Sequence, residues 1–439
     1  MKTIFITSFH PIISRNILGT PLLDLLLKEE DVQLVIIGRD KKADFFRGQF
    51  GRNRIIIQGI HTKRNRTDHF LQYLAFSAVD SESLRIKRLT EMKGRGSLFF
   101  RFLTNPVGRA FVRFLTKLLV HDGQVEALFE KYKPDLVFST DIQNDFDVRF
   151  ILEAQKRKVR NVGMIRSWDN PASKGLIRVL SNRFIVHNRV VEKELKDLHG
   201  IQQTPIDVVG IPHYDRYAGS LMSREEAAKK MGLDPRRKVA LFVPVGDRYI
   251  ESNTVDRDVL AFLDTALPPE WNILVRLPFS DSVSFLDDRK SEGRVIFDRP
   301  VPHFELLKNN ELSTADEERL VATLTLVDIV VSGPSTIVVD AAFFDKPVIL
   351  IAFDGEEKRN ELKSVVRYFK YTHWQPVLKS GGVCFARTKE QAKKCLDEYV
   401  RDSSKDKDGR KRIVEAECFS RDGKSSERLA EVLLTELND

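Results

Sequence analysis

One acidic side chain in an otherwise apolar segment is the first sign of chemistry in this chain. The acid is Asp340, on a mostly apolar helix that follows a turn made of Gly333, Pro334, Ser335 and Thr336. Glycine permits close backbone approach, and the start of a helix offers N–H groups and a positive dipole end to an anion. Thr336 and Asp340 share a helix face, about 6 Å apart along the axis. A phosphate at the turn would therefore leave an attached ribose near the Asp340 carboxylate, which can accept hydrogen bonds from both ribose hydroxyls.

A simpler interpretation of the same residues stays open. Ser335 could be an ordinary N-cap, and Asp340 could be a solvated helix residue or an acid favoured near a helix start. The neighbours of Asp340 are Val338, Val339, Ala341 and Ala342, which do not suggest a wet face. This setting favours a bound nucleotide over the simpler interpretation.

Short β-branched runs alternate with longer helical stretches and must position these residues. Several runs are apolar on both faces, as parallel strands covered by helices should be. The pattern predicts an α/β protein with two doubly wound, Rossmann-like parallel sheets. Twelve strands are expected, at residues 3–8, 33–38, 54–59, 135–140, 161–166, 183–188, 238–245, 272–277, 294–297, 328–332, 347–353 and 382–386. Ligands of such sheets bind beyond the carboxyl ends of the strands, so polar residues there are the candidates for chemistry.

The composition is that of a globular protein of about two domains. The 439 residues are 42% hydrophobic and 31% charged, with a net charge of +8 that suits an anionic partner. No apolar run approaches the ~20 residues of a bilayer span, and the N-terminus lacks the features of a signal peptide. Cys384, Cys395 and Cys418 lie far apart, so neither a disulfide framework nor a zinc site is expected, in agreement with a reducing, cytoplasmic location.

Several stretches resemble GT-B glycosyltransferases of bacterial surface-polysaccharide synthesis. They are "TSFHPIISRNIL" (7–18), "RSWDNPASKG" (166–175), "VVGIPHYDRY" (208–217) and "DGKSSERLAEVL" (422–433). In this superfamily an acid seven residues before a strand proline binds the ribose, and Asp340 and Pro347 have that spacing. More distantly, the chain resembles UDP-N-acetylglucosamine 2-epimerases and CDP-glycerol glycerophosphotransferases.

The resemblance implies three parts and a cleft between two of them. Residues 1–215 would be an acceptor-binding Rossmann-like domain, and residues 216–415 a nucleotide-sugar-binding one. Residues 416–439 would form a helix that packs back on the first domain.

For the donor diphosphate, the expected partners are two arginines at strand ends of the second domain. Arg248 follows strand 238–245 in a glycine-containing loop, and Arg276 ends the next strand. Arginine suits phosphate because its planar fork makes paired hydrogen bonds. Each could equally be an ordinary surface residue.

A general base for the acceptor is expected from the first domain. The candidates Asp169, His10 and Asp141 each follow a strand, where their side chains could converge. Asp169 before Asn-Pro is also a good turn residue, and His10 before a proline could be structural.

Acceptor contacts are expected close to these residues. Trp168 could stack on a sugar ring, and Asn170 and Lys174 offer polar groups in the same segment. Arg15 begins the helix after the first strand and could face an anionic acceptor or the diphosphate.

The epimerase resemblance fails at one position. Asp141 matches a catalytic acid of those enzymes, but the next strand ends in Arg166, where they carry a catalytic Glu. A permanent cation cannot take that acid's part in elimination and re-addition. The epimerase is therefore ranked below a transferase.

A basic and aromatic segment, residues 98–120, could contact the inner leaflet of a membrane. Its predicted helix places Arg109, Arg113 and Lys117 on one stripe and phenylalanines and leucines on another. An ordinary domain helix with a solvated charged face is the alternative. The local charge and the lack of a binding module argue against nucleic acid.

The sequence thus predicts a cytoplasmic glycosyltransferase, with peripheral contact with the inner membrane face as a further hypothesis. It would move a sugar from a nucleotide-sugar donor, UDP-linked in the favoured version, to an envelope or capsular glycan precursor, lipid-linked or free. The resemblance implies that no metal or cofactor is needed, and Asp145 and Asp147 in "DFD" suit a helix start better than the metal motif they resemble. The alternatives are a CDP-glycerol or CDP-ribitol phosphotransferase, an epimerase-like enzyme, and a nucleotide-binding scaffold without catalysis.

Overall fold

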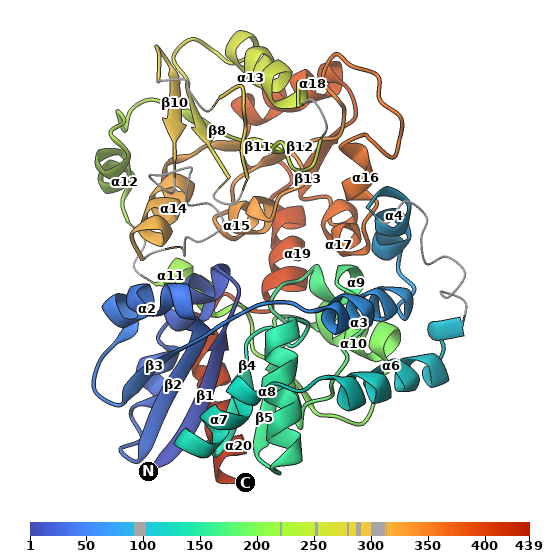
Figure 1. Cartoon of the computed structure of the whole chain (residues 1–439). Helices are drawn as coiled ribbons and strands as arrows, with labels where there is room; N and C mark the ends of the chain where they lie inside the picture. Colours follow the sequence, from blue (N-terminus) through green and yellow to red (C-terminus); the bar gives the residue numbers. More distant parts are fainter. Residues whose placement is uncertain are drawn as a thin grey trace. The chain divides into compact units, whose positions relative to one another are not determined.

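The chain forms two compact units, each built on its own parallel sheet (Figure 1). The structure is a computed structural model that describes residues 1–91, 102–219, 222–250, 253–278, 281–286, 291–299, 312 and 314–439. The first unit holds residues 1–216 and 422–439, and the second holds residues 217–421. The roles expected of the two units remain predictions.

The sheet of the first unit has seven parallel strands in the order β3-β2-β1-β4-β5-β6-β7. Alternate residues of β1 enter different cores: Ile4 and Ile6 pack with Leu429 and Leu433, while Phe5 packs in a separate cluster. Both faces of the sheet are therefore covered, as the apolar runs predict. The strands are β1 (Lys2–Ser8), β2 (Val32–Arg39), β3 (Ile55–Ile60), β4 (Leu136–Ser139), β5 (Arg160–Met164), β6 (Arg183–Val186) and β7 (Ile206–Val208).

Helices connect these strands and cover the two faces of the sheet (Figure 1). Several begin with a side-chain cap, among them α3, where Asn65 and Asp68 form a capping box. The helical segments are η1 (Ser14–Leu18), α1 (Leu22–Leu26), η2 (Asp40–Lys42), α2 (Ala43–Phe50), α3 (Arg66–Ser77), α4 (Glu82–Thr90), α6 (Pro106–Leu119), α7 (Gly123–Tyr132), α8 (Asp145–Lys156), α9 (Asn170–Ser173), α10 (Arg189–His199), η3 (Pro212–Tyr214) and α20 (Ser425–Asn438), and α11 (Asp215–Ala218) spans the division between the units.

The sheet of the second unit has six parallel strands in the order β10-β9-β8-β11-β12-β13. Its strands are β8 (Val239–Val243), β9 (Asn272–Arg276), β10 (Val295–Asp298), β11 (Ile329–Ser332), β12 (Val348–Ile351) and β13 (Val383–Ala386). Its helical segments are α12 (Arg224–Met231), α13 (Val255–Ala266), α14 (Thr314–Leu326), α15 (Ile337–Phe343), α16 (Val366–Phe369), η5 (Thr372–Trp374), α17 (Gln375–Lys379), α18 (Lys389–Arg401) and α19 (Lys407–Cys418).

The predicted α/β class with two Rossmann-like sheets is confirmed, and all twelve expected strands are present. The prediction missed β7, an edge strand of three residues, because so short a run has no detectable period. In each sheet the strand order reverses beside the first strand, between β1 and β4 and between β8 and β11. Loops diverge at such a point, so the residues that follow these strands are well placed to bind a ligand.

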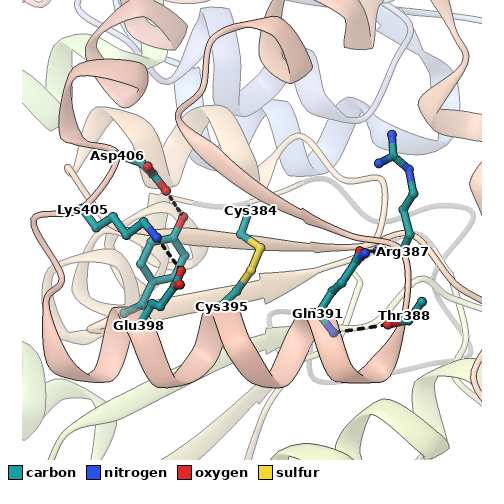
Figure 2. The surroundings of a disulfide bond; sticks show 9 residues. Cys384, Arg387, Thr388, Gln391, Cys395, Glu398, Lys405 and Asp406 are labelled. Atoms are coloured by element: carbon teal, nitrogen blue, oxygen red, sulfur yellow. Dashed lines mark hydrogen bonds and ion pairs between the residues drawn. A yellow bond between two sulfur atoms is a disulfide. The ribbon is translucent and has the colours of Figure 1, made fainter.

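The expectation that the cysteines form no disulfide is wrong. Cys384 of β13 and Cys395 of α18 are joined by a disulfide bond, and Cys418 is free and buried (Figure 2). The two residues are 11 apart in sequence, but a tight turn returns the chain along the strand it has just left. The N–H of Arg387 bonds to the side chain of Gln391, and Thr388 caps α18, which holds that turn. A separation of 11 residues matches no ligand motif, and only the return of the chain from strand to helix brings the two sulfur atoms together.

Candidate functional site

Ionisable side chains follow neighbouring strands at the carboxyl edge of the first sheet. His10 follows β1, Asp141 follows β4, Arg166 follows β5 and His187 follows β6. Because parallel strands end at one edge of a sheet, a row of this kind borders a common surface. This edge holds the base candidates that the sequence predicts.

His10 lies at the reversal of strand order beside several cations. Burial, followed by the positive charge of Arg166 and then of Lys174, Lys42 and Arg39, lowers the pKa of His10 to about 2. The ring is held by the turn after β1, where the N–H of Ile12 lies 3.4 Å from Nδ1. The imidazole is therefore neutral at physiological pH, and it is a weak base while these cations are not neutralised.

Asp141 is paired with the arginine that distinguishes this chain from the epimerases. Nε of Arg166 donates to Oδ2 of Asp141 at 2.7 Å, and both side chains are largely buried. Nδ2 of Asn170 lies 3.4 Å from the other oxygen of Asp141. Asn170 is itself only 1% exposed, so it contacts Asp141 from the interior and presents almost no surface that an acceptor could contact.

A buried acid that the sequence argument treated as a helix-start residue lies next to Asp141. Asp147 does belong to the first turn of α8, as expected, but its carboxylate is fully buried. Its Oδ1 accepts hydrogen bonds from the hydroxyls of Thr7 and of Ser139, the latter at 2.9 Å. Burial, with the negative charge of Asp141, raises the pKa of Asp147 to about 8. The sequence signal was present, since both hydroxyl residues belong to strands that flank the strand-order reversal.

The loop with Asp169 forms the next part of the edge. Asp169 precedes α9, and its Oδ2 accepts a hydrogen bond of 3.0 Å from the hydroxyl of Ser173. Trp168 is half-buried and Lys174 is exposed. Glu194 of α10, which the sequence analysis missed, feels the negative charge of Asp169, and burial followed by that charge raises the pKa of Glu194 to about 8.

Arg15 lies on η1, where its Nε donates to Oδ1 of Asn16 at 2.7 Å. Its charge acts on His213 of η3. Burial, and next the positive charge of Arg15, lower the pKa of His213 well below its ordinary value. Burial and Arg166 likewise lower the pKa of His187 to about 4. Arg15, which was predicted for the acceptor, and Arg166, which was not, thus act on further histidines that stay neutral.

In the second unit, the Gly-Pro-Ser-Thr turn leads from β11 into α15 as predicted. A Cβ on Gly333 would collide with the side chain of Val245, in the loop after β8, so glycine is needed for this close approach. The helix is short, residues 337–343, and the N–H of Val339 bonds to the carbonyl oxygen of Thr336 at 3.0 Å. Thr336 is exposed, while Pro334 and Ser335 are half-buried.

Asp340 is 8% exposed and has a partner within the unit. The hydroxyl of Tyr217 donates to Oδ1 of Asp340 at 3.0 Å, and the ring of Tyr217 packs edge-on against Phe343 and Phe344. The negative charge of Asp340 also acts on the buried thiol of Cys418 in α19. The carboxylate is therefore held by a neutral donor in an apolar setting, not on a solvated helix face.

The loop after β8 carries Arg248 on the surface, but carboxylates occupy several of its backbone donors. The N–H groups of Val245 and Gly246 donate to Asp256 at 2.7 and 3.0 Å. The N–H of Arg248 donates to Asp281 at 3.2 Å, while its side chain is exposed. The loop is thus held rigid by internal acids, and the guanidinium is the group that can reach a phosphate.

Arg276 lies at the end of β9, as predicted, but within an ion-pair network. It pairs with the fully buried Asp298 of β10, which also pairs with Arg319 of α14. The two cations pair a buried carboxylate that would be costly to leave unpaired. This arrangement favours a structural place for Arg276 over a phosphate contact.

The basic stripe predicted on residues 98–120 is oriented differently from the expectation. Residues 98–101 lie outside the described residues. Within α6, Arg113 turns inward, where its guanidinium donates to the carbonyl oxygens of Ile177 and His199, the latter at 2.7 Å. Arg109 lies against Gly200, the side chains of Phe111, Phe114 and Leu118 are exposed, and Leu115 packs on a core cluster. The expectation of one outward basic stripe is therefore wrong for Arg113, which bonds to carbonyl groups within the unit, while Lys117 is exposed as expected.

Among the described residues, no group of three or more His, Cys, Asp or Glu side chains is placed to hold a metal ion. No described helix has both the length and the apolar character needed to cross a bilayer.

The two units, each with an all-parallel Rossmann-like sheet, define a GT-B-like fold. The model of the family described as CDP-glycerol:poly(glycerophosphate) glycerophosphotransferase matches residues 170–435, more than half of the chain. The protein belongs to this family. A search of curated proteins found no match to the chain.

Solved structures of the same fold span the whole chain at low identity. The MnaA–UDP co-structure from S. aureus is 14% identical with a TM-score of 0.58, covering 100% of this chain and 97% of that one. The UDP-GlcNAc 2-epimerase from Methanocaldococcus jannaschii is 14% identical with a TM-score of 0.57, covering 99% and 100%. The wall teichoic acid polymerase TagF is 12% identical with a TM-score of 0.53, covering 100% and 89%. These likenesses establish the fold.

Proposed function

We propose that this protein transfers a polyol phosphate of the glycerol-phosphate class from a CDP-linked donor to an anionic precursor of a cell-wall polymer. The family match over residues 170–435 carries the proposal, because it spans nearly all of the second unit, where the nucleotide is expected. The TagF structure of the same fold is described as soaked with CDPG, which agrees with such a donor. This choice promotes the phosphotransferase alternative above the nucleotide-sugar transferase favoured by the sequence.

The proposed step forms one bond and breaks one. A hydroxyl oxygen of the acceptor attacks the polyol-bearing phosphorus of the donor, and the bridging P–O bond breaks. CMP leaves with the electron pair, and the hydroxyl proton passes to His10 once bound phosphate has offset the nearby cations and raised the pKa of the imidazole. Positioning and charge stabilisation dominate such reactions, so cations near the base matter as much as the base itself.

The cations around His10 fit an anionic acceptor. Arg166, Lys174, Lys42 and Arg39 all act on the imidazole electrostatically, which places positive charge on one side of the first unit. A bound phosphate would neutralise part of this charge and raise the pKa of His10 towards its ordinary value. The base would then become stronger when its substrate arrives.

Other residues of the first unit have supporting parts in this proposal. Asp141 orients Arg166 through their 2.7 Å ion pair, so it is less available as a base than the sequence suggests. Asp169 remains a second candidate base, since its loop carries Lys174 and Trp168. Arg15 is assigned to the acceptor phosphate.

The second unit is proposed to bind the nucleotide. The phosphates would lie at the turn of residues 333–336, with the exposed guanidinium of Arg248 as a partner. Asp340 would bind the pentose through its carboxylate, which lies in an apolar setting beside the hydroxyl of Tyr217. No metal or cofactor is included, and the location is the cytoplasm at the inner face of the membrane.

A glycosyl transfer from a nucleotide sugar is the second candidate. It is favoured by Trp168, an aromatic side chain beside Asp169 and just outside the matched range, which could stack on a sugar ring. MnaA, which shares the fold, is described in complex with UDP. In this reaction the bond between the anomeric carbon and the phosphate oxygen breaks, and a nucleoside diphosphate leaves.

The identity of the released nucleotide separates these candidates. Purified protein would be incubated with membranes that contain acceptor and with either CDP-glycerol or UDP-sugars, and the nucleotides would be separated by chromatography. We expect acceptor-dependent release of CMP from CDP-glycerol, abolished in His10→Asn but retained in the exposed-residue control Arg257→Gln. Release of UDP alone would establish the glycosyltransferase, and release of neither, with donor binding intact, would favour the scaffold.

A further inference from the structure

One helix of the first unit exposes a continuous row of large apolar side chains. On α6, Val107, Phe111, Phe114 and Leu118 follow the spacing of one helix face, and their exposed fractions range from 49% to 79%. Twelve large apolar side chains of the described residues are exposed, and six of them lie between residues 102 and 119. The term apolar ridge is used below for these six residues: Phe102, Val107, Phe111, Phe114, Leu118 and Leu119.

The opposite face of α6 is anchored, so the ridge cannot roll inward. Val112 and Thr116 are fully buried, and Val112 belongs to a core cluster with residues of α3 and α4. Arg113 is tied to the carbonyl oxygens of Ile177 and His199. A Cβ on Gly108 would collide with the backbone of Leu103, which shows how closely the two segments pack.

The charge around the ridge selects the kind of surface that could cover it. From residue 102 to residue 121 the described chain contains no Asp or Glu but three Lys or Arg residues, which are Arg109, Arg113 and Lys117. A second copy of this chain packed through the same ridge would bring these cations together without acids to pair them. An anionic lipid surface offers both an apolar interior for the phenylalanines and negative charge for the cations.

We propose that the apolar ridge inserts into the interface of an anionic lipid bilayer, with α6 lying parallel to the membrane plane. The helix of 14 residues would extend for about 21 Å along the surface. Phenylalanine and leucine side chains would enter the boundary of the acyl chains, and the exposed Lys117 would lie among the headgroups. Insertion by apolar side chains, and not adhesion by Arg109 and Arg113, holds the protein. This inference does not depend on the identity of the donor.

Flotation of the full-length protein with lipid vesicles tests the inference without any substrate. Vesicles of phosphatidylcholine alone would be compared with vesicles that also contain phosphatidylglycerol. We expect the wild type to float with the anionic vesicles and the triple variant Phe111→Ser, Phe114→Ser, Leu118→Ser to lose at least about tenfold in partitioning. Lys117→Gln should cause a smaller loss that disappears at high salt.

The matched control removes exposed apolar side chains elsewhere. Leu180→Ser and Leu362→Ser alter leucines of 37% and 41% exposure, and vesicle binding should stay at the wild-type level. Thermal unfolding and nucleotide binding of each variant show whether it has folded. Equal flotation of the triple variant and the wild type would overturn the proposal. So would a wild-type dimer in light scattering that the triple variant converts to a monomer without loss of lipid binding.

Discussion

The Asp340 carboxylate has a protein partner, Tyr217, and is predicted to have a ligand partner, the donor ribose. Asp340→Ala should weaken binding of the nucleotide donor by about 1–3 kcal/mol, because buried hydrogen bonds to the ribose would be lost. Isothermal titration with CDP-glycerol measures this loss.

Tyr217→Phe is the matched control for that measurement. It removes the 3.0 Å bond to Oδ1 but leaves the carboxylate, so it should cost about 0.5–1.5 kcal/mol of stability with donor affinity largely retained. If both variants lower the melting temperature and neither changes donor affinity, Asp340 is a structural residue and the ribose assignment is wrong.

His10 should remain neutral far below the pH at which an ordinary histidine protonates. Its pKa is lowered to about 2, so the free protein carries an uncharged imidazole from neutral pH down to mildly acidic conditions. Because positive charge contributes to this shift, Lys174→Gln should raise the pKa of His10, and bound phosphate should raise it further. The chemical shift of the His10 ring in NMR titrations reports each change.

The control for the titration is an unstructured peptide that contains the His10 segment, in which the imidazole titrates at its ordinary pKa of about 6.5. A wild-type His10 that titrates together with this peptide would contradict the electrostatic argument and the proposal that cations tune this base.

At the scale of elements, α20 at the C-terminus packs against the sheet that begins with β1 at the N-terminus. Leu429 and Leu433 are fully buried in the cluster that contains Ile4 and Ile6 of β1. Glu436, also buried, pairs with Arg183 of β6 and with Arg160 of β5. The last helix is therefore part of the core of the first unit.

Leu433→Ala should destabilise the first unit by about 2–5 kcal/mol, because it leaves a cavity beneath β1. Hydrogen exchange should become faster in β1 and β4, while β8 and β11 of the second unit keep their protection. The exposed residue Thr435 on the same helix provides the control, since Thr435→Ala should change neither. Uniformly faster exchange in both units would show that they unfold as one cooperative body.

At the scale of the whole molecule, the family match covers only part of the residues to which chemistry is assigned. The matched residues, 170–435, include the proposed nucleotide-binding turn but not His10, Asp141 or Asp169. Family membership therefore supports the proposed donor, whereas the proposed acceptor site and general base are argued from the geometry of the first unit. The proposals are tested separately for this reason.

The sequence by itself determined the α/β class, twelve strands and the turn before α15, because apolar periodicity and turn residues act locally. It also found the resemblance that the family match bears out. Only the tertiary structure decided which charges meet. Residues from separate elements meet in the Asp141–Arg166 and Arg276–Asp298 pairs and in the Cys384–Cys395 disulfide. The burial of Asp147 likewise depends on how its helix packs on neighbouring elements. The outward face of α6 was decided in the same way: helix periodicity defines two stripes, but the carbonyl groups at the end of α10 determine which stripe packs inward.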